Sequence, residues 1–346
     1  MNTPTQAPVD SINETKGNTP LVRLSRMSSD SGISIWGKLE SFNPGGSAKD
    51  RSAAALLEDA LMRGQVSPGG TVIESSSGNL GVALARECAL RSLHFHCVVD
   101  PRANSQTVAT MAALGATVHH VTQPDPETGD WLAARQTKVA ELLQEFPNSI
   151  NLDQYSNQAV FEAHSQGTMR EIVTQLGHAP SHLFVAVSTT GTIGGCLRYL
   201  REIDANTKVI AVDAMGSVLY DGTRADRVLP GFGAGVVPEL SRQFTPDDVI
   251  RIDSPHAIAG ARLVAQREGF LPGASGGAVA AAFLSMINEF DDNDDAVLIF
   301  HDHGNAYLDT VYDDDWVRRN VCEPESLPNL LTQPNPDHTT NYEEPA

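Results

Sequence analysis

Short runs of β-branched and apolar residues alternate along this chain with longer amphipathic stretches. Such alternation is typical of βαβ units, in which helices cross between the parallel strands of a sheet. It predicts an α/β fold built on mainly parallel strands. The predicted strands are 33–39, 71–75, 93–99, 117–121, 183–187, 208–213, 249–252 and 296–300, and the predicted helices are 50–62, 81–90, 105–114, 131–145, 161–175, 193–202, 255–268 and 277–288.

Charge and composition exclude several classes of function. The formal net charge is -19, which repels phosphate backbones and anionic membrane surfaces, so we expect neither nucleic acid nor a membrane as a partner. No apolar run approaches the roughly 20 residues that span a bilayer, and the first residues, MNTPTQAPVD, lack the pattern of a signal peptide. We therefore expect a soluble, cytoplasmic protein. The four cysteines form no CxxC pair, and the paired histidines have no convergent carboxylates, so no metal site is expected.

Three polar, glycine-containing segments each adjoin a predicted strand and open a predicted helix. They are 74–81 (ESSSGNLG), 188–195 (STTGTIGG) and 273–278 (GASGGA). In open α/β sheets, ligands bind at the carboxyl ends of strands, where helix N-termini offer unpaired N–H groups. The segments could therefore face one cleft, although glycine and serine also serve simply to make tight turns.

Lys49 is the most informative of the five lysines. It lies in a turn-forming run, 43–51 (NPGGSAKDR), that leads directly into a predicted helix. The dipole at a helix N-terminus destabilises an ammonium group, which lowers its pKa and favours a nucleophilic amine of the kind that forms Schiff bases. A solvated lysine in the first helical turn is the alternative at this point.

The ordered set of NPGGSAKDR, SSSGNLG, a Ser/Thr/Gly loop and GASGGA resembles the fold-type II pyridoxal-phosphate enzymes of the cysteine synthase / cystathionine β-synthase family. The resemblance extends from about Asn18 to Trp316. It implies two open, twisted, mainly parallel sheets flanked by helices, as in the tryptophan synthase β subunit. It further implies a larger cofactor-binding domain (1–43 and 156–320), a smaller mobile domain (44–155) and a homodimer. The remaining residues, 321–346, are acidic and are expected to form a disordered tail.

The resemblance also assigns cofactor-binding residues. Lys49 would bind pyridoxal 5'-phosphate covalently and later carry the Cα proton, and Asn79 would hydrogen-bond the 3-oxygen of the pyridine ring. The phosphate loop would be Ser188, Thr189, Thr190, Gly191 and Thr192. Ser188 and Thr190 replace two glycines of the family pattern, and the Ser188 side chain is expected to narrow the pocket. Ser275 would contact the pyridine nitrogen, and a neutral hydroxyl there would not keep that nitrogen protonated.

Substrate-binding residues follow from the same resemblance. The substrate carboxylate would be bound by Ser75, Ser76, Ser77 and Gly78, with assistance from Gln154. Leu80 stands where cysteine synthases have threonine, so a substrate is expected to be held differently here. Arg135 is a candidate for binding a carboxylate, because guanidinium pairs with carboxylates bidentately, and Tyr155 and Ser188 are candidate hydrogen-bond donors. Arg135 could equally be a surface residue of an amphipathic helix.

The segment 300–316 narrows the choice of reaction. Residues 309–316 of this segment, DTVYDDDW, are similar to the sequence of one branch of the family. That branch makes N-(2-amino-2-carboxyethyl)-L-glutamate, a precursor of 2,3-diaminopropionate in siderophore and antibiotic pathways. That branch implies β-replacement on O-phospho-L-serine by the amine of L-glutamate, through an aminoacrylate intermediate. The alternatives are a cysteine synthase that uses O-acetylserine or O-phosphoserine with sulfide, and an inactive paralogue. An inactive paralogue would be expected to lack Lys49, Asn79 or Ser275, and all three are present.

Overall fold

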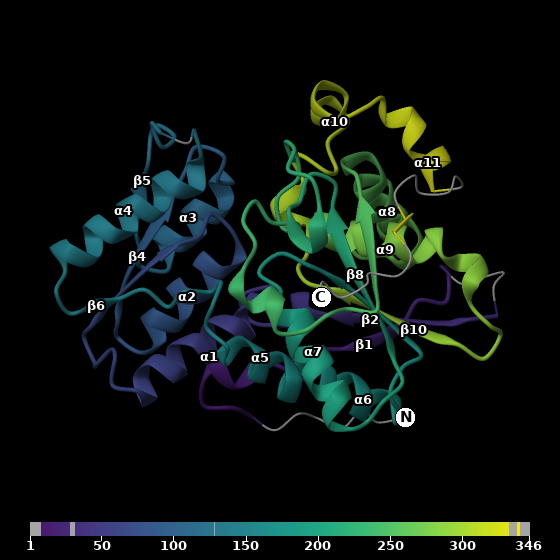
Figure 1. The fold of residues 1–346 in the computed structure, drawn as a ribbon, viewed down its shortest axis with the longest axis horizontal. Helices are drawn as coiled ribbons and strands as arrows, with labels where there is room; N and C mark the ends of the chain where they lie inside the picture. Colours follow the sequence, from purple (N-terminus) through teal and green to yellow (C-terminus); the bar gives the residue numbers. More distant parts are fainter. Residues whose placement is uncertain (1–7, 28–31, 128, 332–337, 340–346) are drawn as a thin grey trace.

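Two sheets organise the residues that the computed structural model describes, which are 8–27, 32–127, 129–331 and 338–339. Figure 1 shows them side by side, with the smaller sheet on the left. The larger sheet has the order β1-β2-β10-β7-β8-β9-β11, parallel in its centre, with β1 and β11 antiparallel at its two edges. Its strands are β1 Leu21–Arg23, β2 Ser34–Leu39, β7 His182–Ala186, β8 Lys208–Ala214, β9 Asp248–Ile252, β10 Asp295–Phe300 and β11 His338–Thr339.

The smaller sheet is parallel throughout and has the order β5-β4-β3-β6. Its strands are β3 Thr71–Ser75, β4 His94–Val99, β5 Thr117–His120 and β6 Ser149–Ile150. Two mainly parallel sheets flanked by helices confirm the predicted α/β fold class. The predicted domain boundaries at 43/44 and 155/156 stay a prediction.

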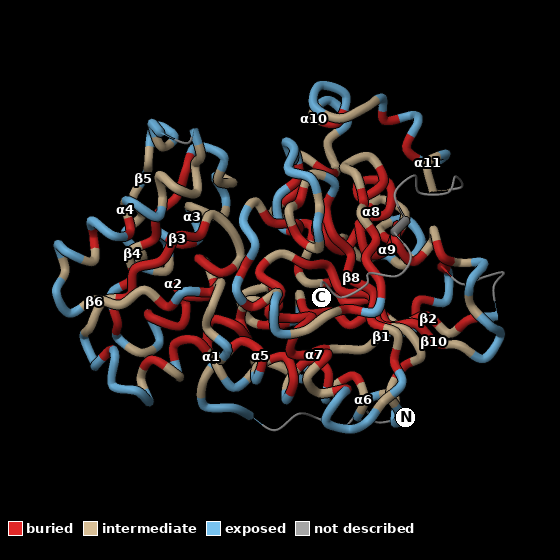
Figure 2. The backbone as a smooth tube through the Cα atoms, viewed as in Figure 1, coloured by how far each residue is buried: buried red, intermediate tan, exposed pale blue. Residues whose placement is uncertain are grey.

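Helices cover both faces of each sheet, as parallel strands require. Successive residues of β7 face opposite cores, because Phe184 packs with α8 and α9 whereas Val185 packs with α7. In the smaller sheet, α1 and α2 contribute to one core and α4 to the other. The tube in Figure 2 is accordingly red along the strands and blue at the outer turns. The helices are α1 Lys49–Met62, α2 Asn79–Leu90, α3 Ser105–Ala113, α4 Trp131–Glu145, α5 Ala159–Glu162, α6 Arg170–Leu176, α7 Gly191–Glu202, α8 Ser254–Glu268, α9 Ala274–Ser285, α10 Asp314–Asn320 and α11 Leu327–Leu330.

The structure departs from the predicted elements in three short strands and within one predicted helix, and it adds α10, which was not predicted. The strands β1, β6 and β11 were not predicted, because each has only two or three residues and no apolar alternation. The predicted helix 161–175 is divided into α5, a π-helical segment Ala163–Met169 and α6. Within the π-helical segment, a Cβ on Gly167 would lie 2.8 Å from Nη1 of Arg51, so this glycine leaves room for a buried guanidinium.

Residues 321–331 correct the expectation of a disordered tail. They include a 3₁₀ turn, Pro324–Ser326, and α11, and the side chain of Leu327 is buried against the core of the larger sheet. Burial of an apolar anchor offsets the entropy lost on ordering the segment. The predicted tail otherwise lies outside the described residues, apart from the two residues of β11. Among the helices described, none is long and apolar enough to cross a membrane.

Candidate active site

A pocket of about 210 Å³ lies where the loops that follow β3 and β7 meet the first residues of α1 and α9. All predicted site residues line it: Lys49, Ser75, Ser76, Ser77, Gly78, Asn79, Arg135, Gln154, Tyr155, Ser188, Thr189, Thr190, Gly191, Thr192 and Ser275. The expectation that the three glycine-containing segments face one cleft is therefore confirmed. Their individual chemical roles stay predictions.

Lys49 is the first residue of α1, and its side chain enters this pocket. The preceding turn is held by Asp50, whose carboxylate accepts hydrogen bonds from the backbone N–H groups of Gly45 and Ser47. Burial lowers the pKa of Lys49 from 10.5 to about 8. Within the described part of the chain, Nζ has no hydrogen-bond or ion-pair partner. These findings favour the nucleophilic amine over the alternative of a solvated lysine.

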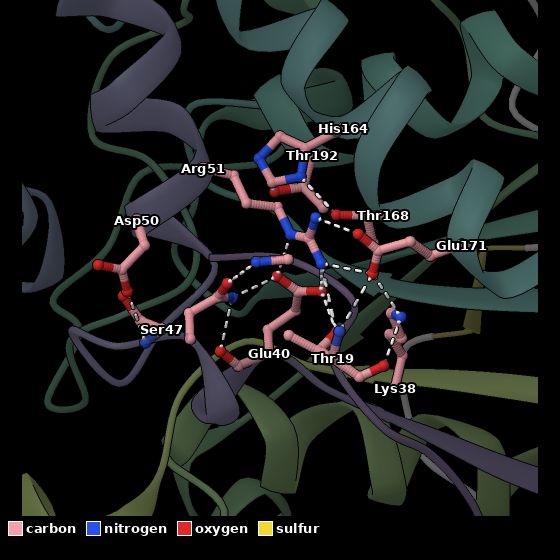
Figure 3. Close-up of polar contacts among 12 residues, drawn as sticks. Thr19, Lys38, Glu40, Ser47, Asp50, Arg51, His164, Thr168, Glu171 and Thr192 are labelled. Atoms are coloured by element: carbon pink, nitrogen blue, oxygen red, sulfur yellow. Dashed lines mark hydrogen bonds and ion pairs between the residues drawn. The ribbon is translucent and has the colours of Figure 1, made fainter. Parts of the chain in front are cut away.

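A buried ion network surrounds Arg51, in the first turn of α1 and two residues after Lys49 (Figure 3). Arg51 pairs with Glu40 through Nε and with Glu171 through Nη1, both at 2.7 Å, and Nζ of Lys38 pairs with Glu171 at 2.7 Å. Although burial alone would raise the pKa of Glu171, its contacts with Arg51 and Lys38 hold that pKa at about 2. The network ties the start of α1 to β2, to the 3₁₀ turn Glu40–Phe42 and to α6, and so fixes the position from which Lys49 extends.

His164 links the same helix to the predicted phosphate loop (Figure 3). Its Nε2 lies 3.0 Å from Oγ of Ser52 on α1 and 3.4 Å from Oγ1 of Thr192, and its Nδ1 lies 2.9 Å from Oγ1 of Thr168. Burial, together with the positive charges of Arg51 and Lys49, places the pKa of His164 well below its usual value. A neutral ring therefore bridges the lysine helix and the loop.

The loop 188–192 keeps the backbone shape that glycine would give it. Thr190 has φ +63°, in the left-handed region, and occupies the N-cap of α7. A β-branched residue is strained there, at a cost of about 1–2 kcal/mol, so the surrounding contacts enforce this conformation. Oγ of Ser188 donates a hydrogen bond to the carbonyl of Gly233 at 3.0 Å. The expected role of Ser188 as a donor to substrate is not available in this arrangement, because its only hydroxyl proton is already used.

The loop 75–79 presents hydrogen-bonding groups to the pocket from the other sheet. Gly78, at the N-cap of α2, supplies no side-chain cap, and the N–H groups of Asn79 and Leu80 have no side-chain acceptor among the described residues. Oγ of Ser75 is buried without a hydrogen-bond partner among the described residues. Oγ of Ser76 accepts from the backbone N–H of Gly81 at 2.9 Å and stiffens the turn. Free N–H and hydroxyl groups of this kind suit a carboxylate ligand.

Arg135 is not a surface residue, since its side chain is 12% exposed and lines the pocket. Nε lies 3.3 Å from Oδ2 of Asp100, a nearly buried carboxylate that also binds Arg102. This contact is an ion pair without a hydrogen bond, since Nε has no hydrogen-bond partner among the described residues, and the Nη groups remain available. Burial raises the pKa of the neighbouring Tyr155, and the positive charges of Arg135 and Arg227 partly oppose that effect.

Several further residues of the pocket were not predicted from the sequence, and Asp302 is the most informative of them. Its Oδ2 accepts a hydrogen bond from Nδ2 of Asn79 at 2.8 Å and another from the hydroxyl of Tyr307 at 3.0 Å. Both Asp302 and Tyr307 belong to the segment 300–316, whose resemblance to the family was the available signal. His301 lines the pocket beside them. No cluster of three or more His, Cys, Asp or Glu side chains among the described residues could hold a metal ion.

The residues present fit pyridoxal phosphate. Lys49 offers an unpaired, weakly basic amine for the aldehyde carbon. The N-terminus of α7 and the hydroxyls of Thr189 and Thr192 line the same pocket and suit a phosphate dianion. Asn79 and Ser275 lie at the N-termini of α2 and α9 and supply polar contacts for the edges of a ring.

Comparisons with known proteins agree with this geometry. The sequence model of the family described as "Pyridoxal-phosphate dependent enzyme" matches residues 12–302. A protein of Cupriavidus metallidurans named N-(2-amino-2-carboxyethyl)-L-glutamate synthase is 40% identical over 328 residues, which are 94% of this chain and 96% of the relative. A protein of the same name from Ralstonia nicotianae is 39% identical over 309 residues, or 89% and 91% of the two chains.

Solved structures show the same fold. The crystal structure of O-ureido-L-serine synthase superposes with a TM-score of 0.80 at 29% identity, over 90% of this chain and 100% of the other. The structure of an O-acetylserine-dependent cystathionine β-synthase from Helicobacter pylori superposes with a TM-score of 0.81 at 27% identity, over 88% and 99% of the two chains.

Proposed function

This chain belongs to the pyridoxal-phosphate-dependent enzyme family, and from that membership we propose that it exchanges the β-substituent of O-phospho-L-serine for the amine of L-glutamate. The products would be N-(2-amino-2-carboxyethyl)-L-glutamate and phosphate. The observation that carries this proposal is the position of Arg135, a pocket cation suited to a substrate with an additional carboxylate. The names of two relatives at 40% and 39% identity support it.

Each part of the pocket then has a task. Lys49, Asn79, Ser275 and the loop 188–192 would hold the cofactor, which when bound would supply an electron sink that makes loss of the substrate's Cα proton possible. Nζ of Lys49 removes that proton and later returns it. The loop 75–79 binds the α-carboxylate of the donor amino acid with backbone N–H groups and hydroxyls. The enclosing walls exclude water, which would compete with the incoming amine.

The two substrates bring four anionic groups to a protein whose own net charge is -19. Phosphoserine carries a phosphate and a carboxylate, and glutamate carries two carboxylates. From 291 to 346 the sequence has 14 acidic and two basic side chains, so much of the negative charge lies in that segment. The pocket itself carries Lys49, Arg135 and the N-termini of α2 and α7. Local groups of this kind bind anions at short range, where the overall charge is largely screened.

The substrates are tested directly. The purified holoenzyme is incubated with O-phospho-L-serine and either L-glutamate or sulfide, and the products are identified by mass. We expect the glutamate adduct and free phosphate. Fast formation of cysteine without any glutamate adduct would instead establish a cysteine synthase. Replacing phosphoserine with O-acetylserine in the same assay identifies the leaving group.

We expect Arg135→Gln to raise the KM for glutamate about 10- to 100-fold, because the variant loses a charge-assisted hydrogen bond worth about 1.5–3 kcal/mol. The KM for phosphoserine should change much less. Arg102→Gln is the matched control, since Arg102 pairs with the same Asp100 but does not line the pocket. Steady-state kinetics with each substrate varied in turn provide the measurement. If both variants raised the KM for glutamate equally, the role of Arg135 would be purely structural.

We expect the apoenzyme to capture pyridoxal phosphate with a rate that depends on the Lys49 pKa of about 8. Below that pH the amine is protonated and cannot attack the aldehyde, so the rate should fall about tenfold per pH unit. Above about pH 8 the amine-dependent part should level off. Stopped-flow absorbance between pH 6 and 10 measures the rate of capture, with Nα-acetyl-lysine as the control. If the rate reached half its maximum at a pH as high as for Nα-acetyl-lysine, the assigned pKa of Lys49 would be contradicted.

We further propose that the enzyme is a cytoplasmic homodimer, that the region 44–155 moves to close the pocket, and that its product serves 2,3-diaminopropionate formation in siderophore or antibiotic pathways. Sedimentation of the holoenzyme with and without phosphoserine tests two of these proposals. The sedimentation coefficient reports the oligomeric state, and its increase on adding phosphoserine would report closure of the region 44–155. A single monomeric species at micromolar concentration would contradict the first of these proposals.

A further inference from the structure

His301 is a histidine of the pocket that the proposed reaction does not use. It directly follows β10 and lines the pocket together with Lys49 and Thr192. Both of its ring nitrogens are buried and have no hydrogen-bond partner among the described residues. Buried polar atoms in folded proteins nearly always have a partner. An unpaired imidazole in the wall of a pocket therefore indicates a contact with the molecule that binds there.

The strand before His301 places the ring between α1 and the predicted phosphate loop. Side chains alternate along a strand, and Ile299 packs against α7 whereas Phe300 packs into the core that includes α9. His301 therefore lies on the face of the sheet that α7 covers, and the loop 188–192 leads into this helix. The carbonyl of His301 accepts the backbone N–H of Ala48 at 2.7 Å, so the same residue also lies against the turn that precedes α1.

The ring of His301 is neutral near pH 7. Burial and the positive charge of Lys49 lower its pKa from 6.5 to about 4, and Glu40 and the carbonyl of Ile299 oppose only part of that effect. His164, which is itself neutral, is the other titratable group that interacts with the ring. A neutral imidazole has one N–H donor and one acceptor nitrogen. The ring can therefore offer an N–H group to an anion.

The phosphate loop has fewer free donors than its sequence suggests. Oγ of Ser188 donates to the carbonyl of Gly233 at 3.0 Å, and Oγ1 of Thr190 donates to the carbonyl of Thr189 at 2.7 Å. Each hydroxyl has a single proton, so neither can donate to a phosphate in this arrangement. The donors that remain are the N–H groups at the start of α7 and the hydroxyls of Thr189 and Thr192. A phosphate dianion can accept a further hydrogen bond beside these.

We propose that His301 is an additional ligand of the cofactor's phosphate, to which one ring N–H donates a hydrogen bond. The position of His301 between Lys49 and the loop 188–192 suits this task, because the cofactor spans the same interval. Its aldehyde carbon reaches the lysine and its phosphate reaches the loop. The contact supplies a donor where the hydroxyls of Ser188 and Thr190 are already used. The inference rests on the binding of pyridoxal phosphate and not on the identity of the substrates.

Ligands with and without a phosphate distinguish this role from a structural one. The probes are 4'-deoxypyridoxine 5'-phosphate and 4'-deoxypyridoxine, which have no aldehyde and cannot bond covalently to Lys49. Calorimetric titration of the full chain, freed of cofactor, measures the affinity for each. In His301→Leu we expect the phosphorylated ligand to bind about 10- to 100-fold more weakly, because a hydrogen bond to a charged group is lost. The affinity for the ligand without phosphate should change little.

A conservative variant and a spectroscopic measurement make the result specific. His301→Gln keeps an N–H donor and should retain most of the affinity that depends on the phosphate. In the holoenzyme, the ³¹P NMR signal of the cofactor should shift in His301→Leu and much less in His301→Gln. If circular dichroism shows that His301→Leu does not fold, His301→Phe, which also lacks a donor, takes its place.

Two results would overturn the proposal. One is an equal loss of affinity for the two ligands, or no loss for either, in the variant without a donor. The other is a His301→Gln variant that binds the phosphorylated ligand as weakly as His301→Leu does. Failure of the glutamate assay would contradict the proposed substrates but would leave these affinities unchanged.

Discussion

Lys49→Ala is expected to lose the covalent attachment of the cofactor and at least about a thousandfold in kcat/KM. The variant removes both the amine that captures the aldehyde and the group that carries the Cα proton, and proton transfer alone contributes about 10²–10⁴-fold. Lys49 is the only one of the five lysines that lines the pocket, so no neighbouring lysine can replace it. Denaturing mass spectrometry after borohydride reduction should show the cofactor adduct in the wild type and none in the variant.

The matched control is Lys138→Ala. Lys138 lies on α4, pairs with Glu141 and does not line the pocket. This variant should retain both the adduct and the activity. A reduced adduct located on a peptide other than the one that contains Lys49 would contradict the assignment. Persistence of activity in Lys49→Ala would refute the proposed proton transfer.

Glu171→Ala is expected to destabilise the fold by about 3–5 kcal/mol, because it removes one partner from a buried ion network. The fully buried Lys38 would lose its ion pair with Glu171, and Arg51 would keep only Glu40 as an ion-pair partner. Two backbone N–H groups, those of Asn18 and Thr19, would also lose their acceptor. Urea unfolding followed by circular dichroism measures the free energy of unfolding. Since the network fixes the start of α1, cofactor affinity should fall as well.

The sign of the pH dependence follows from the pKa of Glu171, about 2 in the folded protein against an ordinary value of 4.5. A lowered carboxyl pKa contributes stability that is fully present above about pH 4.5 and is lost as the pH falls toward 2. The difference between wild type and Glu171→Ala should therefore shrink between pH 7 and pH 3. Glu202→Ala, which removes an exposed ion pair with Arg198, is the control and should cost less than about 1 kcal/mol. Equal losses in the two variants would contradict the assigned role.

The central elements of the fold could be predicted from the sequence because their pattern is local. The strand 71–75 and the helix 131–145 were predicted with the bounds that the structure has. Short edge strands such as β1 could not be predicted, since pairing with β2, and not the residues of β1, makes it a strand. The π-helical segment Ala163–Met169 also depends on a distant residue, because Gly167 there lies against the guanidinium of Arg51.

The sequence predicted which residues form the candidate site, but not the contacts that these residues make. Motif order placed Lys49, Asn79, the loop 188–192 and Ser275 together, and the structure places them in one pocket. The sequence left Arg135 open between a surface position and a ligand-binding one, and burial beside Asp100 decided it. The hydrogen bond from Ser188 to Gly233 spans 45 residues, and that from Asn79 to Asp302 spans 223. No local pattern reports such pairs.

The sequence by itself determined the α/β class, the family and the lysine available for covalent chemistry, because periodicity and ordered motifs are properties of neighbouring residues. Only the tertiary structure decided which groups remain unpaired in the pocket. Oγ of Ser75 and Oδ1 of Asp302 lack partners among the described residues, whereas the Ser188 hydroxyl is already engaged. Burial and hydrogen bonding depend on what packs against a group, and those neighbours come from distant parts of the chain. They set the protonation and orientation on which the chemistry depends.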